Sequence, residues 1–100
     1  PAGDASDEDR NDKILLHDGF TIIPNPNDGY FDILFTAPIE EGTIEIYNLL
    51  GERVWDYRIQ KGLDKLSIKS TDFRQKTAGV YRVVVKNKFA KYVQSFVIIN

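Results

Sequence analysis

The chain is 100 residues long and 42% hydrophobic, which allows one hydrophobic core but leaves no room for two domains with a cleft between them. It contains no cysteine, so disulfides, thiolate metal sites and thiol nucleophiles are excluded. No apolar run reaches the roughly 18 residues that a membrane-spanning helix needs, so no transmembrane segment is predicted.

Charge is distributed unevenly along the chain, although the formal net charge is only −2. Residues 14–50 carry six acidic residues and no lysine or arginine, whereas residues 51–100 carry eleven basic residues and four acidic ones. Acidic strands could pair with basic strands, because opposite charges that face each other in a sheet are mildly stabilising. Alternatively, the lysines could converge on one basic face that binds an anionic partner. The sequence leaves both arrangements open.

Residues 1–13, which read PAGDASDEDRNDK, predict a flexible acidic linker. They lack aromatic and branched aliphatic side chains, so they cannot bury enough surface to offset the entropy lost on ordering. The aspartates do not have the glycine and terminal glutamate of a calcium-binding EF-hand loop. The chain also begins at Pro1 and lacks methionine, from which we expect it to be a piece of a longer polypeptide.

From Ile14 onward, short runs of β-branched and aromatic residues recur at the spacing of a sandwich or barrel. Residues 13–16 and 20–23 are the first predicted strands. The segment 24–29 reads PNPNDG and must reverse the chain, because its prolines fix φ and Asp28-Gly29 supplies a left-handed position. Residues 30–36 then alternate in polarity, which predicts a strand with one face in the core.

Pro38 and residues 40–42 form the next predicted connection, and residues 43–48 alternate again with Glu45 facing outward. Gly51, in a left-handed conformation, is expected to close a hairpin with residues 53–60. In that strand Val54 suits the core, whereas three apolar residues of opposite parity follow it, Trp55, Tyr57 and Ile59. This pattern predicts a β-bulge or a partly exposed aromatic face.

The last third of the chain predicts three more strands. Leu66 and Ile68 mark a short one, and residues 70–78 form a polar connection that Phe73 anchors to the core. Residues 80–86 and 92–99 follow, joined by a turn at 87–90. Seven or so strands with short connections favour antiparallel pairing. We therefore predict an all-β, antiparallel sandwich formed by residues 14–100.

Residues that could carry catalysis are few. His17 is the only histidine, so neither a zinc cage nor a nucleophile–histidine pair can be assembled around two such groups. Glu40, Glu41 and Glu45 could in principle supply an acid and a base for glycoside cleavage, but Glu40-Glu41 lies in a predicted turn. No glycine-rich phosphate loop is present. We predict no enzymatic activity, no metal and no cofactor.

Lysines and aromatic residues interleave near the C-terminal end, at Lys86, Lys88, Phe89, Lys91 and Tyr92. Such a pattern can indicate a stacking platform for single-stranded nucleic acid. However, the pI is about 5.3, no RNP-type motif is present, and lysines are common at exposed sheet edges. We therefore predict no nucleic-acid binding.

Several blocks, taken in chain order, resemble the type A C-terminal sorting domains of the type IX (Por) secretion system of Bacteroidetes. They are PNPNDG at 24–29, IEIYNLLGERV at 44–54, AGVYRV at 78–83 and the last strand with Lys91 and VII at 97–99. The resemblance covers residues 20–100, and the matching motif positions are Pro24, Asn25, Pro26, Gly29, Asn48, Leu49, Gly51, Val54, Gly79 and Tyr81. Two features depart from the family pattern: Asn100 replaces a basic last residue, and RQKTA at 74–78 replaces Leu-Pro-Ala or Leu-Pro-Ser.

The resemblance implies an immunoglobulin-like sandwich without a catalytic site, at the C-terminus of an exported cargo protein. The cargo domain would lie upstream in the same polypeptide, cross the periplasm and reach the cell surface or be secreted. The implied partners are the type IX secretion machinery and a surface sortase that cleaves near Ala2, Gly3, Ala5 or Ser6. The residues predicted to be recognised are Lys86, Lys88, Lys91, Val97, Ile98, Ile99 and Asn100. The alternative function is an adhesive or carbohydrate-binding module that uses Trp55 and Tyr57 as a stacking platform.

Overall fold

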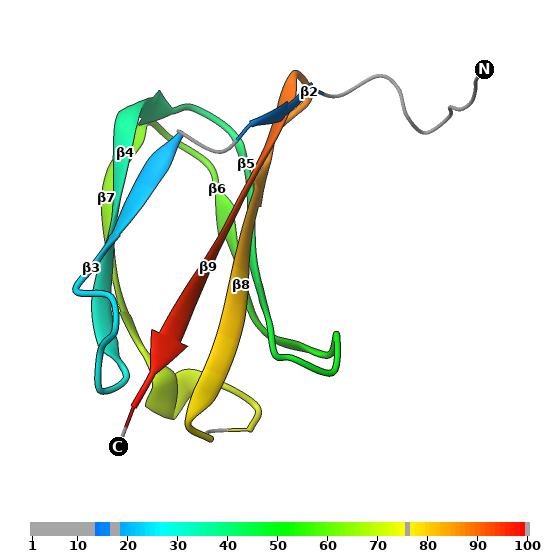
Figure 1. Ribbon diagram of the computed structural model, residues 1–100. Coiled ribbons are helices and arrows are strands. Elements are labelled where there is room, and N and C mark those ends of the chain that lie inside the picture. The colour runs from blue at the N-terminus through cyan, green and yellow to red at the C-terminus, as the bar shows by residue number, and fades with distance from the viewer. Residues whose placement is uncertain (1–13, 17–18, 76, 100) are drawn as a thin grey trace.

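The computed structural model describes residues 14–16, 19–75 and 77–99. Figure 1 shows two layers of strands with the C-terminal strand running the length of the molecule. The strands are β2 (Ile14–Leu16), β3 (Phe20–Ile23), β4 (Tyr30–Ile39), β5 (Gly42–Tyr47), β6 (Arg53–Ile59), β7 (Leu63–Lys69), β8 (Gly79–Lys86) and β9 (Ala90–Ile98), with a 3₁₀ turn η1 (Ser70–Asp72) after β7.

The strands form a five-stranded sheet of order β2-β9-β8-β5-β6 and a three-stranded sheet of order β3-β4-β7. The prediction of an all-β sandwich is therefore confirmed. Among the described strands, pairing is antiparallel except between β2 and β9, which run parallel. An isolated bridge between Asn27 and Ile98 is parallel as well. The antiparallel pairing that the short connections favour is found in the other described strand pairs of the sandwich, and the short β2 adds one parallel pair. Short connections favour antiparallel neighbours, but β2 and β9 lie at opposite ends of the chain, so no such connection sets their relative direction.

The core lies between the two sheets and takes alternate residues of β3, β4, β5 and β8, as the polarity pattern predicts. Aromatic rings fill its centre: the centroids of Phe31 and Phe96 lie 4.6 Å apart, and those of Tyr81 and Phe96 lie 5.6 Å apart. Phe73 packs on Tyr81 with centroids 5.6 Å apart, which confirms its predicted role as the anchor of the connection after β7. The Tyr81 hydroxyl also donates to the Thr77 carbonyl at 2.5 Å, so one side chain holds both the core and the loop before β8.

One expectation for the middle of the chain was wrong, and a second was right about the face of the sheet but did not include burial. Pro38 was placed in a connection, but β4 continues through it to Ile39 after a register irregularity that begins at Leu34. Proline has no backbone N–H to donate to a neighbouring strand, and the irregular register means that no such bond is needed at Pro38. Glu45 does face away from the core, yet it is only 8% exposed, because Tyr47, Arg53 and Lys86 close over it.

The hairpin of β5 and β6 confirms both turn and bulge. Gly51 has φ +85°, the predicted left-handed conformation. The register passes from Ile46 opposite Trp55 to Tyr47 opposite Arg53, which leaves Val54 as the extra residue of a bulge. The bulge changes the parity of β6, so Val54 and the aromatic residues after it can face the same side of the sheet.

Candidate recognition surface

The C-terminal end of β9 is held from both sides. β8 pairs with it at Gly79–Ile98 and Val80–Val97. On the other side the turn at 24–29 continues the sheet: Asn27 donates its backbone N–H to the Val97 carbonyl at 2.9 Å, and Ile99 donates to the Asn27 carbonyl at 2.7 Å. The Oδ1 atom of Asn25 accepts the N–H of Val97 at 3.0 Å. The terminal strand thus ends in a fixed, extended geometry.

Asn27 is the residue that shapes this turn, and it is only 3% exposed. Its Nδ2 donates to the Pro24 carbonyl at 3.0 Å, and its Oδ1 accepts the Gly29 N–H at 2.8 Å. Gly29 has φ +106°, and its carbonyl accepts the Ser70 N–H at 2.7 Å. The turn therefore joins three segments that are far apart in the sequence: its own residues, the end of β9 and η1.

The predicted recognition residues at the C-terminus differ in their access to solvent. Ile98 belongs to the core, Val97 is half-buried on the outer face of the five-stranded sheet, and Ile99 is 52% exposed. Asn100 lies outside the described residues, as do Ala2, Gly3, Ala5, Ser6 and His17. A partner that approaches the folded domain can therefore reach Ile99 and the outer side of Val97.

The predicted lysines lie at the other end of β9. Lys86 and Lys91 face each other across β8 and β9 on the outer face, while Lys88 sits at the tip of the hairpin between the two strands. The Nζ of Lys88 lies 5.9 Å from the ring centroid of Phe89, which is 72% exposed. Figure 1 shows this hairpin and the C-terminus at opposite ends of the molecule, so the predicted residues do not form one cluster.

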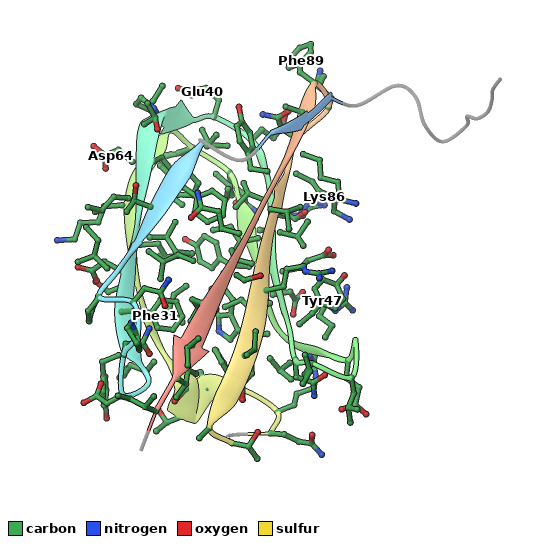
Figure 2. All side chains as sticks on the ribbon, viewed as in Figure 1. Phe31, Glu40, Tyr47, Asp64, Lys86 and Phe89 are labelled. Atoms are coloured by element: carbon green, nitrogen blue, oxygen red, sulfur yellow. The ribbon has the colours of Figure 1, made fainter. Side chains whose placement is uncertain are left out.

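Charge pairing between the two halves of the chain is present, as one of the two sequence interpretations predicts. Glu45 accepts from Arg53 at 3.2 Å and from Lys86 at 3.2 Å, and Asp32 lies 3.8 Å from Lys65. Figure 2 shows Lys86 and Tyr47 on the side of the five-stranded sheet that faces away from the core. The pairing uses part of the basic charge and leaves part of it exposed on that face.

Among the described residues, Glu45 is the carboxylate with the most side-chain partners: Tyr47, Arg53 and Lys86. Burial by itself would raise its pKa, but hydrogen bonds from Tyr47, Lys86 and Arg53 and the charge of Lys86 hold the pKa below its ordinary value of 4.5. Burial, together with the hydrogen bond to Glu45 and its negative charge, raises the pKa of Tyr47. The lowered pKa keeps Glu45 ionised at neutral pH, and its ion pairs with Arg53 and Lys86 join β5 to β6 and to β8. Sequence alternation alone could not identify this role, since it gives the face and not the neighbours.

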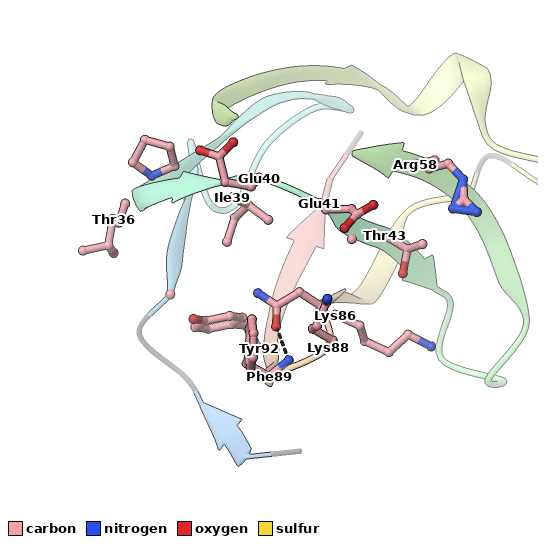
Figure 3. A pocket seen from close by; sticks show the side chains of 15 residues that line it. Thr36, Ile39, Glu40, Glu41, Thr43, Arg58, Lys86, Lys88, Phe89 and Tyr92 are labelled. Carbon is pink, nitrogen blue, oxygen red and sulfur yellow. Dashed lines mark hydrogen bonds between the residues drawn. The ribbon is translucent and has the colours of Figure 1, made fainter. Parts of the chain in front are cut away.

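The remaining predicted features lie elsewhere. Glu40 and Glu41 line a hollow of about 910 Å³ together with Ile39, Phe89 and Tyr92 (Figure 3), but Glu45 is not part of it. The three glutamates therefore do not meet. Among the described residues no three histidine, cysteine or acidic side chains are grouped as metal ligands, and no helix has the length and hydropathy of a membrane span.

The two rings of the proposed aromatic platform lie parallel, but only one of them is exposed. The rings of Trp55 and Tyr57 are parallel to within 3°, with centroids 6.0 Å apart. Tyr57 is 39% exposed, whereas Trp55 packs against the core. Only part of this pair is open to a ligand.

Comparison with known proteins identifies the family. The model of the family described as secretion system C-terminal sorting domain matches residues 21–99, nearly the whole described part of the chain. No curated protein matches the chain. The family is a sorting signal and not a catalytic one, which implies contact with the secretion machinery and export to the cell surface or beyond. The chain therefore belongs to the C-terminal sorting domains of type IX secretion.

Proposed function

We propose that this domain is the address of an exported cargo protein and that the secretion machinery reads the end of β9 in its folded, extended form. The observation that carries the proposal is the double attachment of residues 97–99 to β8 and to the turn at 24–29. A segment that is already ordered loses little entropy on binding, so it can be read with fewer contacts. Ile99 and the outer side of Val97 would be the first atoms that a partner meets.

The lysines at the other end of β9 would provide the charged part of the signal. Lys91 and Lys88 extend from the same strand and hairpin as the terminal residues, and positive charge mainly speeds the encounter with an acidic partner. Lys86 is partly neutralised by Glu45, so we expect it to contribute less than Lys88 and Lys91.

The route and fate of the cargo are part of the same proposal. The cargo would lie upstream of the linker formed by residues 1–13, cross the periplasm with this domain folded, and be joined to the cell surface after a sortase cuts near Ala2, Gly3, Ala5 or Ser6. The supporting feature is the composition of residues 1–13, a flexible acidic linker in this proposal, because proteases cleave extended segments of small and polar residues.

A reporter fused ahead of the chain tests this function. We expect display on the surface of a host with an intact type IX system and none in a secretion-deficient host. Deletion of residues 97–100 should abolish display, whereas Lys61→Ala, at an exposed position between β6 and β7, should not. Mass spectrometry of the exported reporter should locate the cut within residues 1–13. A cut inside residues 31–99 would contradict the cleavage proposal.

A second candidate, carbohydrate binding, is favoured by the parallel rings of Trp55 and Tyr57 alone. It predicts that the isolated domain binds an oligosaccharide and that Tyr57→Ala removes the binding. Display in neither host, with glycan binding retained after deletion of residues 97–100, would favour this candidate over the sorting function.

A further inference from the structure

The turn between β5 and β6 presents two leucines to solvent. Leu49 is 79% exposed and Leu50 is 83% exposed. A surface leucine is ordinary by itself, but two adjacent ones at the tip of a hairpin form an apolar knob of the kind found in protein interfaces.

This turn is held rigidly by the residues around the leucines. The Oδ1 of Asn48 accepts the N–H groups of Leu50 at 3.0 Å and Glu52 at 2.9 Å, and its Nδ2 donates to Glu52 Oε1 at 2.8 Å. The Asn48 carbonyl accepts the Gly51 N–H at 3.0 Å. None of these bonds involves the side chains of Leu49 or Leu50. These bonds fix the backbone that carries the leucines, and the leucine side chains take no part in them.

A groove of about 370 Å³ runs from this turn across the outer face of the five-stranded sheet. Leu49 and Tyr47 line one part of it, and Arg82, Ser95 and Lys91 line the rest. Val80 and Val97 continue the same face toward the C-terminus, because they pair with each other in the register that places Arg82 opposite Ser95. The outer face thus connects the two ends of β9, which the ribbon alone places far apart.

The charge of this face is positive. Glu45 is shared by Arg53 and Lys86, and Asp56 lies 3.8 Å from Arg74. Within the described part of the chain, Arg82 and Lys91 have no ion-pair partner. The exposed cations of the groove are therefore available to carboxylates of another molecule.

We propose that the outer face of β5, β8 and β9, with the Leu49–Leu50 turn, is a docking surface for an acidic protein that has an apolar pocket. The inference rests on the proposed function, since it places this partner on the export route, but it names a surface beyond the terminal residues. The two leucines insert into the pocket of the partner, and carboxylates of the partner pair with Arg82 and Lys91. A protein fits better than an anionic bilayer, because Glu52 stands beside the leucines while the cations lie on the sheet and not at the tip.

Two double variants of the full chain test the surface in the reporter fusion. Leu49→Ser/Leu50→Ser and Arg82→Glu/Lys91→Glu should each lower display at least tenfold in the competent host, with thermal unfolding of the purified chain unchanged. The matched controls are Ile23→Ser/Tyr30→Ser, which removes exposed apolar side chains of the three-stranded sheet, and Lys61→Glu/Lys69→Glu, which makes the same change of charge elsewhere. Both controls should be displayed as the wild type is.

A competition experiment separates docking from any general effect on export. The wild-type chain without a reporter, co-expressed in excess, should reduce display of the wild-type fusion several-fold by occupying the partner. The leucine variant should not compete. Equal competition by both chains, or display of the groove variants at the wild-type level, would overturn the inference.

Two further measurements decide between occupants. If light scattering shows that the wild type self-associates and the leucine variant does not, the turn binds a second copy and the proposed partner is wrong. If the wild type, but not the variants, sediments with phosphatidylglycerol vesicles, the surface binds a membrane and the proposed protein partner is also wrong. Failure of the wild-type fusion to be displayed in the competent host would instead refute the proposed function itself.

Discussion

Two turns of this molecule are built around an asparagine in the same way but serve different purposes. Asn27 and Asn48 each accept the N–H of the residue two positions later, and each is followed by a glycine with positive φ. Asn27 is buried and its backbone also bonds to Val97 and Ile99, whereas the side-chain bonds of Asn48 stay within its own turn. The same local chemistry therefore stabilises the whole sandwich in one place and positions exposed side chains in the other.

The largest difference between the two turns should appear when each asparagine is replaced. Asn27→Ala leaves the part-buried carbonyl of Pro24 and the buried N–H of Gly29 without a side-chain partner, so we expect a loss of about 2 kcal/mol in the free energy of unfolding. Asn48→Ala exposes similar groups to water and should cost about 1 kcal/mol. Urea unfolding of the two variants measures both values. Equal losses would show that burial of the Asn27 side-chain hydrogen bonds adds nothing to their contribution to stability.

The glycines of the two turns extend the comparison. A Cβ at Gly29 would lie 2.3 Å from Ser70 Oγ, while a Cβ at Gly51 would meet nothing within 4 Å. Both substitutions with alanine incur the backbone cost of positive φ, roughly 1 kcal/mol. Gly29→Ala must also displace Ser70, so its total should be about 2 kcal/mol. Thermal unfolding should give the Gly51→Ala variant a clearly higher midpoint temperature than Gly29→Ala. A midpoint for Gly29→Ala as high as that of Gly51→Ala would mean that Ser70 moves aside at no cost.

Glu45 supplies a pH-dependent contribution on the side of the Asn48 turn. Its pKa in the folded chain is lower than in the unfolded chain, so its stabilisation is complete above the unfolded value of about 4.5 and is lost as the pH falls through the folded value. Because its cations are partly exposed, we expect about 1 kcal/mol at neutral pH. Glu45→Gln should lose this amount at pH 7 and approach the wild type in acid. Parallel stability curves from pH 7 to pH 3 would contradict the assignment.

How far the sequence leads can be judged from the same residues. Polarity alternation locates the strands and the core side of β4, β5 and β8, and the left-handed position of Gly51 follows from turn chemistry. The partners of Asn27 could not be predicted, because residues 97 and 99 reach it only through the tertiary arrangement of the strands. Burial of Glu45, the parallel pairing of β2 and the groove beside Leu49 depend on neighbouring strands for the same reason. Sequence reasoning named Lys91 and Val97 in one set of recognition residues, but only the sheet register shows that both lie on the outer face of the sheet.

The smallest effect on stability is expected at Asn25, and it tests the proposed function most directly. Its Oδ1 accepts the N–H of Val97 at an exposed site, so Asn25→Ala should cost only about 0.5 kcal/mol. The loss falls on the end of β9, which should exchange its amide protons faster at residues 97 and 99 while the centre of β8 keeps its protection. If the machinery reads an ordered terminal strand, display of the fusion should fall several-fold although the domain remains folded.

The substitution Asn48→Ala, at another exposed turn, removes hydrogen bonds that do not hold β9, so it serves as the control for exchange at residues 97 and 99. Faster exchange at residues 97 and 99 with undiminished display would show that the signal is read as a loose peptide, and the ordered end of β9 would then be a feature of stability alone.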